Sequence, residues 1–254
     1  MREISYYWDL LFILTKKEIK VRYKNSYFGY LWSLLNPLAF AFIFYFVFSM
    51  IMRMQMKNYS LFLITGLFPW QWISNSVLAS TMIYISNASI IKKIDFPRNI
   101  LPLANTLQDM FHFICAIPII IIFMFMYKES PSWSWLYGIP ILLVIQCLMV
   151  YGLSMVFSSL NLFFRDLQQI VAILMMFAFY PTPILYPVKM IPEKYRYLVD
   201  LNIFTPIIIC WREMFLHGTF DFHYLFLAII YSIFSWLLGF LLYKKLRYRF
   251  AEVI

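Results

Sequence analysis

The chain has 254 residues, of which 63% are hydrophobic and only 13% are charged, and its formal net charge is +9. Soluble domains carry roughly 25% charged residues, and outer-membrane barrels show short alternating segments rather than long apolar runs, so both classes are excluded. The composition predicts an all-α membrane protein. In such a protein lysine and arginine gather in cytoplasmic segments, so the positive charge does not indicate nucleic acid as a partner.

Residues 1–30 are predicted to form an amphipathic helix on the cytoplasmic membrane surface. At 3.6 residues per turn, one arc of the helix holds Trp8, Leu11, Phe12, Thr15, Ile19 and Tyr23. The predicted interface residues are Trp8, Lys16, Lys17, Lys20, Arg22 and Lys24. Such a helix can be a simple anchor at acidic headgroups or a dock for a partner protein. The segment shows no pattern of a cleaved signal peptide.

Residues 31–254 are predicted to form a single transmembrane domain with six helices, each about the 20 residues needed to cross the bilayer. The charge-free runs that predict them cover residues 31–52, 60–86, 110–127, 135–160, 167–186 and 224–243. A further apolar segment, residues 203–216, is shorter and contains Arg212 and Glu213. We therefore predict that it is re-entrant or interfacial.

The distribution of basic residues predicts that both termini are cytoplasmic, in the inner membrane. With six spans, most of the 21 lysines and arginines fall on the side of the termini. They are Arg2, Lys16, Lys17, Lys20, Arg22, Lys24, Lys92, Lys93, Arg98, Arg165, Lys244, Lys245, Arg247 and Arg249.

The cytoplasmic connection at residues 87–105 alternates apolar and charged side chains, and Pro97 and Pro102 are predicted to break it into short helical pieces. A short amphipathic helix across the membrane plane is a surface that a peripheral partner can grip, although an ordinary interfacial turn has the same pattern. The residues predicted to contact such a partner are Ile91, Lys92, Lys93, Asp95, Phe96, Pro97 and Arg98.

Several prolines interrupt the chain on the outer side, after the fifth predicted span. Because proline removes a backbone donor and breaks helices, the span is predicted to end in kinks and a hairpin that dips back into the membrane. Backbone of this kind is tolerated only beside protein or a water-filled cavity. The residues predicted to form an outer gate are Pro181, Pro183, Tyr186, Pro187 and Arg212.

The chain lacks the residues of an energy-coupling site of its own. The six runs contain no Asp, Glu, Lys or Arg, whereas ion-coupled carriers mark their route with such groups. No G-x-x-x-x-G-K-[ST] loop is present. The three cysteines are predicted to be buried thiols, and the three histidines form no ligand pattern. We predict no catalytic residue, cofactor or metal on this chain.

Three ordered motifs carry a resemblance to a known family. They are IKVRYKNSYFGYLWSLLNPL at residues 19–38, GLFPWQW at 66–72 followed by IIKKIDFPRNILPL, and NLFFRDLQQI with the later PTPILYP. Together they resemble the membrane subunit of ABC-2 type exporters for polysaccharides and polyol phosphates, which includes O-antigen, capsule and teichoic-acid permeases.

The resemblance implies a homodimer that pairs with two copies of an ABC ATPase, which binds ATP and Mg. The loop between the second and third spans would be the coupling helix, and the N-terminal helix would also contact the ATPase. A lipid-linked glycan would enter from the cytoplasmic leaflet and leave through the hairpin between the fifth and sixth spans.

Mid-span aromatic residues are candidates for the substrate pathway. Phe40, Phe44 and Phe48 recur on one face of the first span, and Phe177 and Tyr180 on one face of the fifth. They can offer weakly specific contacts to a sliding sugar chain, or they can pack helices together or face lipid.

Two other functions compete with polysaccharide export as interpretations of the sequence. A lipid-sugar transferase would need acidic or histidine clusters at a membrane edge, whereas Asp95 and Asp166 are isolated. An ABC-2 type exporter of a drug or small lipid shares the topology and remains the alternative.

Overall fold

The computed structural model describes residues 2–22, 26–51, 56 and 58–250, and every regular element in these ranges is a helix. This confirms the predicted all-α class. The main helices are α1 (Arg2–Arg22), α2 (Trp32–Tyr45), α3 (Tyr59–Thr81), α6 (Ile100–Met126), α7 (Trp135–Asn161), α8 (Leu167–Phe179), α10 (Thr205–His217) and α11 (Phe222–Leu246). A π-helical stretch at Phe46–Ile51 continues α2.

Shorter helices occupy the connections. They are η1 (Gly29–Leu31), α4 (Ile83–Ser86), α5 (Ala88–Ile91), η3 (Val188–Met190), η4 (Glu193–Tyr195), α9 (Arg196–Leu201) and η5 (Arg247–Arg249).

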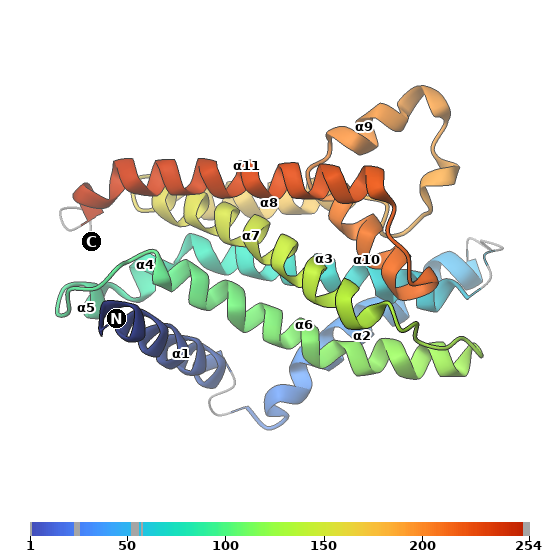
Figure 1. Ribbon diagram of the computed structural model, residues 1–254, viewed down its shortest axis with the longest axis horizontal. Helices are drawn as coiled ribbons and strands as arrows, with labels where there is room; N and C mark the ends of the chain where they lie inside the picture. Colours follow the sequence, from blue (N-terminus) through green and yellow to red (C-terminus); the bar gives the residue numbers. More distant parts are fainter. Residues whose placement is uncertain (1, 23–25, 52–55, 57, 251–254) are drawn as a thin grey trace.

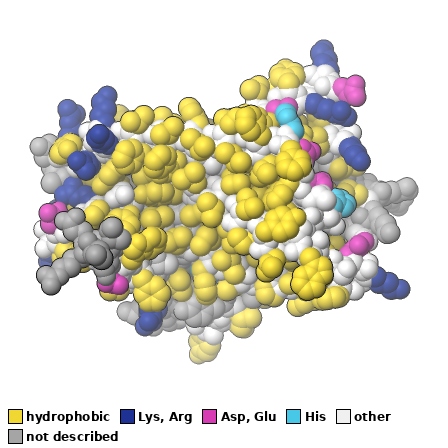
Figure 2. Space-filling view, in the orientation of Figure 1, with side chains coloured by type: hydrophobic (Ala, Val, Ile, Leu, Met, Phe, Trp, Pro, Cys, Tyr) yellow, Lys and Arg dark blue, Asp and Glu magenta, His cyan; other side chains and the backbone are white. Residues whose placement is uncertain are grey.

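The long helices run roughly along one axis of an elongated molecule (Figure 1). The start of α1, the end of α11, and α4 with α5 lie at one end, whereas α9 lies at the other. In the same orientation, hydrophobic side chains cover the middle of the visible face, and lysine and arginine side chains lie at both ends (Figure 2). An apolar middle with charged ends is the surface expected of helices that cross a bilayer.

By length and composition, three helices in the described ranges can cross a membrane: Ile100–Met126, Trp135–Asn161 and Phe222–Arg249. A regular helix pairs most of its backbone groups within the segment, as the hydrocarbon core requires. These three correspond to the predicted third, fourth and sixth spans.

Helix α3 lies at the centre of the bundle and contacts α2, α6, α7, α8 and α10. Most of its residues are buried. Aromatic rings connect it to its neighbours: Trp72 stacks on Phe113 of α6 at 5.6 Å between ring centroids, and Phe113 meets Trp211 of α10 at 4.8 Å. Such aromatic pairs stabilise a fold by more than the burial of their surface alone, so they hold α10 within the bundle.

Helices α7 and α11 approach closely where both carry glycine. A Cβ atom added to Gly239 would lie 2.3 Å from the carbonyl oxygen of Gly152. One turn away, the Ser235 hydroxyl donates a hydrogen bond to the carbonyl oxygen of Met149 at 2.8 Å. Small residues that let helix backbones come together are typical of packing between membrane helices.

The third apolar helix begins earlier than predicted, at Ile100, so residues 87–105 are not all connection. Pro102 lies in the first turn of α6, where its missing N–H leaves no intrahelical bond unmade. The prediction that it breaks the segment is therefore wrong. Asp109 lies inside the same helix, buried, and accepts a hydrogen bond from the Ser76 hydroxyl at 2.8 Å. The expectation of apolar helices free of acidic groups is wrong here, because hydrogen bonding lowers the cost of burying a carboxyl group.

The fifth apolar helix is shorter than predicted. Helix α8 ends at Phe179 and has 13 residues, which corresponds to about 20 Å at 1.5 Å per residue. Pro181 follows almost directly, and because it has no backbone N–H it cannot continue the hydrogen bonding of the helix. Residues 180–204 continue as turns and the short helices η3, η4 and α9 before α10 begins.

Candidate functional site

The predicted coupling loop lies at the end of the molecule that holds both termini (Figure 1). Its helical part, α5, is a single turn. Two of the predicted residues, Ile91 and Phe96, are buried in a cluster with Leu11 and Leu14 of α1. The side chains of four others point outward: Lys92, Lys93, Asp95 and Pro97. The loop therefore has an anchored apolar side and an exposed, mostly basic side.

Hydrogen bonds attach the end of this loop to α7 and α11. The Asn99 backbone N–H donates to the Tyr243 hydroxyl at 3.2 Å, and the Asn99 side-chain amide donates to the Tyr151 hydroxyl at 3.2 Å. Arg98, also predicted to contact a partner, donates to the backbone carbonyl of Arg247 at 3.3 Å. Displacement of the loop must therefore disturb α6, α7 and α11 together.

Helix α1 packs on the same end, and its apolar residues face two directions. Leu11 and Leu14 are buried, whereas Trp8 is 63% exposed and Phe12 is 68% exposed. Packing against α6 therefore buries one stripe of the helix and leaves a second apolar stripe, with Trp8 and Phe12 of the predicted arc, outside. The exposed stripe remains available to lipid or to a partner.

The predicted basic residues of α1 differ in their surroundings. The Lys17 ammonium donates a hydrogen bond to the Asn87 side-chain oxygen at 2.6 Å, which joins α1 to the start of the coupling loop. Lys16 lies over the Phe12 ring, and Lys20 is exposed. The Arg22 side chain and Lys24 lie outside the described parts of the chain.

A half-buried tyrosine of α1, Tyr7, also reaches the Asn99 network. Burial is the main cause that raises the pKa of Tyr7, and a hydrogen bond with Asn99 opposes the rise. Its hydroxyl is therefore protonated at neutral pH.

Ring contacts join three of the candidate pathway residues, Phe40, Phe44 and Tyr180, through Phe179. Phe44 stacks on Phe40, with ring centroids 6.5 Å apart, and on Phe179 of α8, with ring centroids 5.7 Å apart. Phe179, which contacts α2 in this way, was not among the predicted pathway residues. Phe177 and Tyr180 are 65% and 61% exposed. The side chain of Phe48 lies outside the described residues.

At the opposite end, Arg212 of α10 holds the proline-rich segment. Its guanidinium donates to the carbonyl oxygens of Pro183 at 2.6 Å and Ile184 at 3.0 Å. The carbon of the guanidinium lies 3.7 Å from the centroid of the Phe62 ring. Gly66 leaves room for the guanidinium group, because a Cβ atom at position 66 would lie 2.6 Å from it. Arginine suits this position because its planar head stacks and donates several hydrogen bonds at once.

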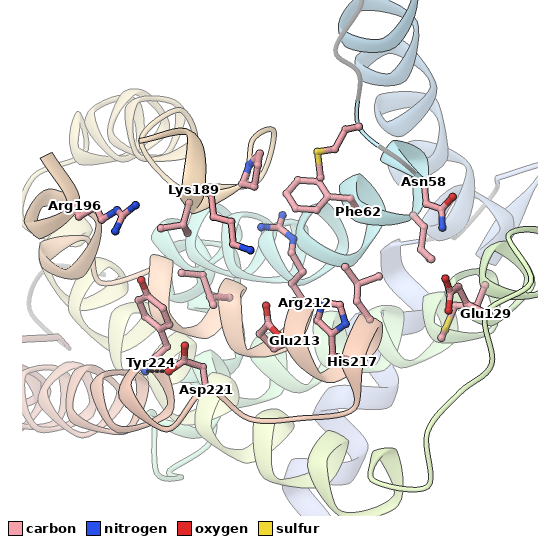
Figure 3. Close-up of a pocket in the computed structure, with 17 residues that line it drawn as sticks. Asn58, Phe62, Glu129, Lys189, Arg196, Arg212, Glu213, His217, Asp221 and Tyr224 are labelled. Carbon is pink, nitrogen blue, oxygen red and sulfur yellow. Dashed lines mark hydrogen bonds between the residues drawn. The ribbon is translucent and has the colours of Figure 1, made fainter. Parts of the chain in front are cut away.

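A cavity of about 960 Å³ opens beside this arginine (Figure 3). It is lined by the start of α3, the end of α6, residues 187–196, α10 and the start of α11. Two predicted gate residues, Pro187 and Arg212, lie in its wall. Pro181 and Tyr186 line a second cavity of about 450 Å³, and Pro183 is buried.

Two residues with central positions were missed in the sequence. Asn99 precedes an apolar run, which is a common helix start, but its hydrogen bonds to distant tyrosines leave no local signal. Asp109 was placed in a connection because it precedes the charge-free run. Among the described residues, no three His, Cys, Asp or Glu side chains gather in a way that could hold a metal ion.

Comparison with known proteins identifies the family. The family model described as "ABC-2 type transporter" matches residues 9–216. The chain belongs to the ABC-2 type transporter family. The match confirms the family predicted from the three motifs, and it contains both the coupling loop and Arg212. As an ABC-2 type membrane subunit with apolar helices, the chain is a multi-pass membrane protein with a role in transport.

Three relatives of this ABC-2 type chain carry the same name. This chain is 49% identical over 251 residues to a protein of Klebsiella pneumoniae named "O-antigen export system permease protein RfbA", and the match covers 99% of this chain and 97% of the relative. A second Klebsiella pneumoniae protein of that name is 47% identical over the same shares. One of Myxococcus xanthus is 29% identical over 194 residues, which is 76% of this chain and 74% of the relative.

Proposed function

We propose that the chain is the transmembrane subunit of an ATP-driven exporter that moves a lipid-linked, O-antigen-like polysaccharide from the cytoplasmic to the outer face of the inner membrane. The observation that carries this proposal is the 49% identity, over nearly the whole of both chains, to a protein named as an O-antigen export permease. The working complex is a homodimer with two copies of an ABC ATPase. ATP and Mg bind to that ATPase, and this chain binds no cofactor.

We place six spans across the membrane, with both termini in the cytoplasm and residues 180–217 as a hairpin that re-enters from outside. The excess of lysine and arginine in the segments on the side of the termini supports this orientation. Helix α8 is too short to cross alone, so residues after Phe179 complete the crossing inside the protein, where irregular backbone is sheltered.

The proposal is tested by expressing the chain with its ATPase in cells that make the glycan but lack their own permease. Surface polysaccharide, detected with antibody on intact cells, is expected to return, and it should stay absent with an ATPase variant that cannot hydrolyse ATP. Efflux of a drug or small lipid without surface glycan would favour the alternative exporter.

The ATPase is proposed to dock on the exposed side of the loop, against Lys92, Lys93 and Asp95, and on the exposed stripe of α1. The double change Lys92→Glu and Lys93→Glu is expected to reduce co-purification of the ATPase several-fold and to reduce export accordingly. The reason is that the exposed ammonium groups make no buried contact within the chain, so their reversal alters the surface rather than the fold. Pull-down through the ATPase measures the effect.

Lys128→Glu is the matched control, because this exposed lysine lies in the connection between α6 and α7 at the other end. Membrane insertion should be equal for both variants. Normal ATPase recovery with the double variant would remove the loop as the docking site.

The substrate pathway is proposed to run beside Phe40, Phe44, Phe48, Phe177 and Tyr180 and to leave at the outer gate. Single cysteines at Phe177 and Tyr180 are expected to react with a water-soluble thiol reagent only during ATP turnover, because these exposed rings would then face a wet channel. Mass spectrometry measures the labelling. Background labelling in variants that still export would assign both rings to lipid or to a dimer contact.

A further inference from the structure

The cavity beside α10 is lined by charged and apolar side chains from five separate parts of the chain. Its volume of about 960 Å³ is at the upper end of the range for sites that hold small ligands. Figure 3 shows Lys189 directed toward Arg212 from a different segment, with Glu213 and His217 on the same helix as Arg212 and Glu129 on another wall. The cavity therefore combines charged groups with an apolar lining.

The cavity wall carries acidic and basic groups in equal number, and in the described parts of the chain no salt bridge joins an acidic group of the wall to a basic one. Glu129, Glu213 and Asp221 face the same space as Lys189, Arg196 and Arg212. In the described parts of the chain, neither Lys189 nor Glu213 forms a salt bridge, and Arg196 pairs with Glu193 outside the cavity lining at 3.5 Å. Both donors and acceptors therefore remain available to a bound molecule.

This balance distinguishes between classes of ligand. A lipid chain would leave the charged groups without polar partners, which is costly. A polyanion would meet three carboxylates as well as the three cations. Hydroxyl groups both donate and accept hydrogen bonds, so an uncharged, polyhydroxylated molecule can satisfy carboxylates, ammonium and guanidinium groups in one site. Tyr224 adds a half-buried aromatic ring to the same wall.

We propose that this cavity binds a short uncharged stretch of the exported glycan through its hydroxyl groups, at the outer end of the protein. The assignment rests on the proposed export function. It places a binding step within each protomer, between α10 and residues 187–196. Arg212 shapes the site, because its two hydrogen bonds to backbone carbonyls fix the proline-rich segment beside the cavity.

Protection of a cysteine by the cell's own glycan tests the site. His217→Cys places a thiol in the exposed part of the cavity wall, and Thr219→Cys places one in the adjacent exposed turn that does not line the cavity. Intact cells are treated with a membrane-impermeant thiol reagent during export, with glycan synthesis on or blocked. Labelling of His217→Cys is expected to fall several-fold when glycan is made, while labelling of Thr219→Cys stays constant. If His217→Cys reduces export, Glu129→Cys places the thiol on another wall of the same cavity and replaces it in the experiment.

The outcomes separate this assignment from the proposed function. Absence of surface glycan with the unaltered chain would overturn the export function itself. Normal export with equal labelling of the cavity cysteine in both states would overturn the cavity assignment alone. If Lys189→Gln abolishes protection while Glu213→Gln increases it, the ligand is an anion, and the assignment to uncharged sugar is wrong. Similar, partial loss of protection in both variants is the expected result.

Discussion

A Gly239→Val variant is expected to accumulate little folded protein in the membrane. The added Cβ would meet the carbonyl oxygen of Gly152 at 2.3 Å, and backbone atoms cannot rotate away as a flexible side chain can. Overpacking of a tight core costs about 3 kcal/mol at the upper end of its usual range, and separation of α7 from α11 would also break the hydrogen bond from Ser235 to Met149. Size-exclusion chromatography of detergent extracts and a melting curve of the surviving material measure the loss.

Leu238→Val is the matched control, because Leu238 is the preceding residue of α11 and is 41% exposed. This variant also introduces a β-branched residue but adds nothing between the two helices, so it should behave like the unaltered chain. A normal yield and melting temperature for Gly239→Val would show that the close approach of α7 and α11 is not needed for folding.

An Arg212→Ala variant is expected to release residues 180–204 from the bundle and to abolish export. The change removes two hydrogen bonds from a charged donor, which contribute roughly 1.5–3 kcal/mol each, and leaves the carbonyl groups of Pro183 and Ile184 buried without these partners. Trypsin should then cut the purified protein faster at Lys189, Lys194 and Arg196. Mass spectrometry of the fragments gives the cleavage sites.

Arg212→Lys should show an intermediate effect, because an ammonium group cannot reproduce the planar stack on Phe62 together with two directed hydrogen bonds. Arg165→Ala removes an exposed arginine at the other end and should leave the cleavage rate in the segment unchanged. Equal cleavage of Arg212→Ala and the unaltered chain would mean that other contacts, such as the hydrogen bond from Asn202 to Thr182, suffice to hold the segment.

The helical class and the positions of the long helices follow from the sequence, because a bilayer allows few alternatives to a run of apolar residues. Helix α7 covers Trp135–Asn161, almost the predicted range. The start of α6 could not be predicted in the same way, because its first turns carry Asp109 and Pro102, which are ordinarily signs of a connection. Burial of Asp109 depends on Ser76, 33 residues earlier.

The candidate sites show the same difference between features that residue type predicts and contacts that it does not. The basic loop at Lys92 and Lys93 is visible in the sequence, because charge between apolar runs marks a surface. The partners of Arg98 and Arg212 are backbone carbonyls distant in the chain, and any residue offers such a carbonyl. Residue type therefore gives no sign of these contacts, such as the one that joins Arg98 to the C-terminal end of its own chain.

The hydrogen bonds at Asn99 also set an order of events during synthesis. Tyr151 and Tyr243 follow Asn99 by 52 and 144 positions, so the ribosome must deliver α7 and then α11 before both bonds can close. A chain interrupted before α11 keeps the loop without its bond to Tyr243 and without the one from Arg98 to Arg247. The loop therefore reaches its final shape only in a chain whose last helix has been made.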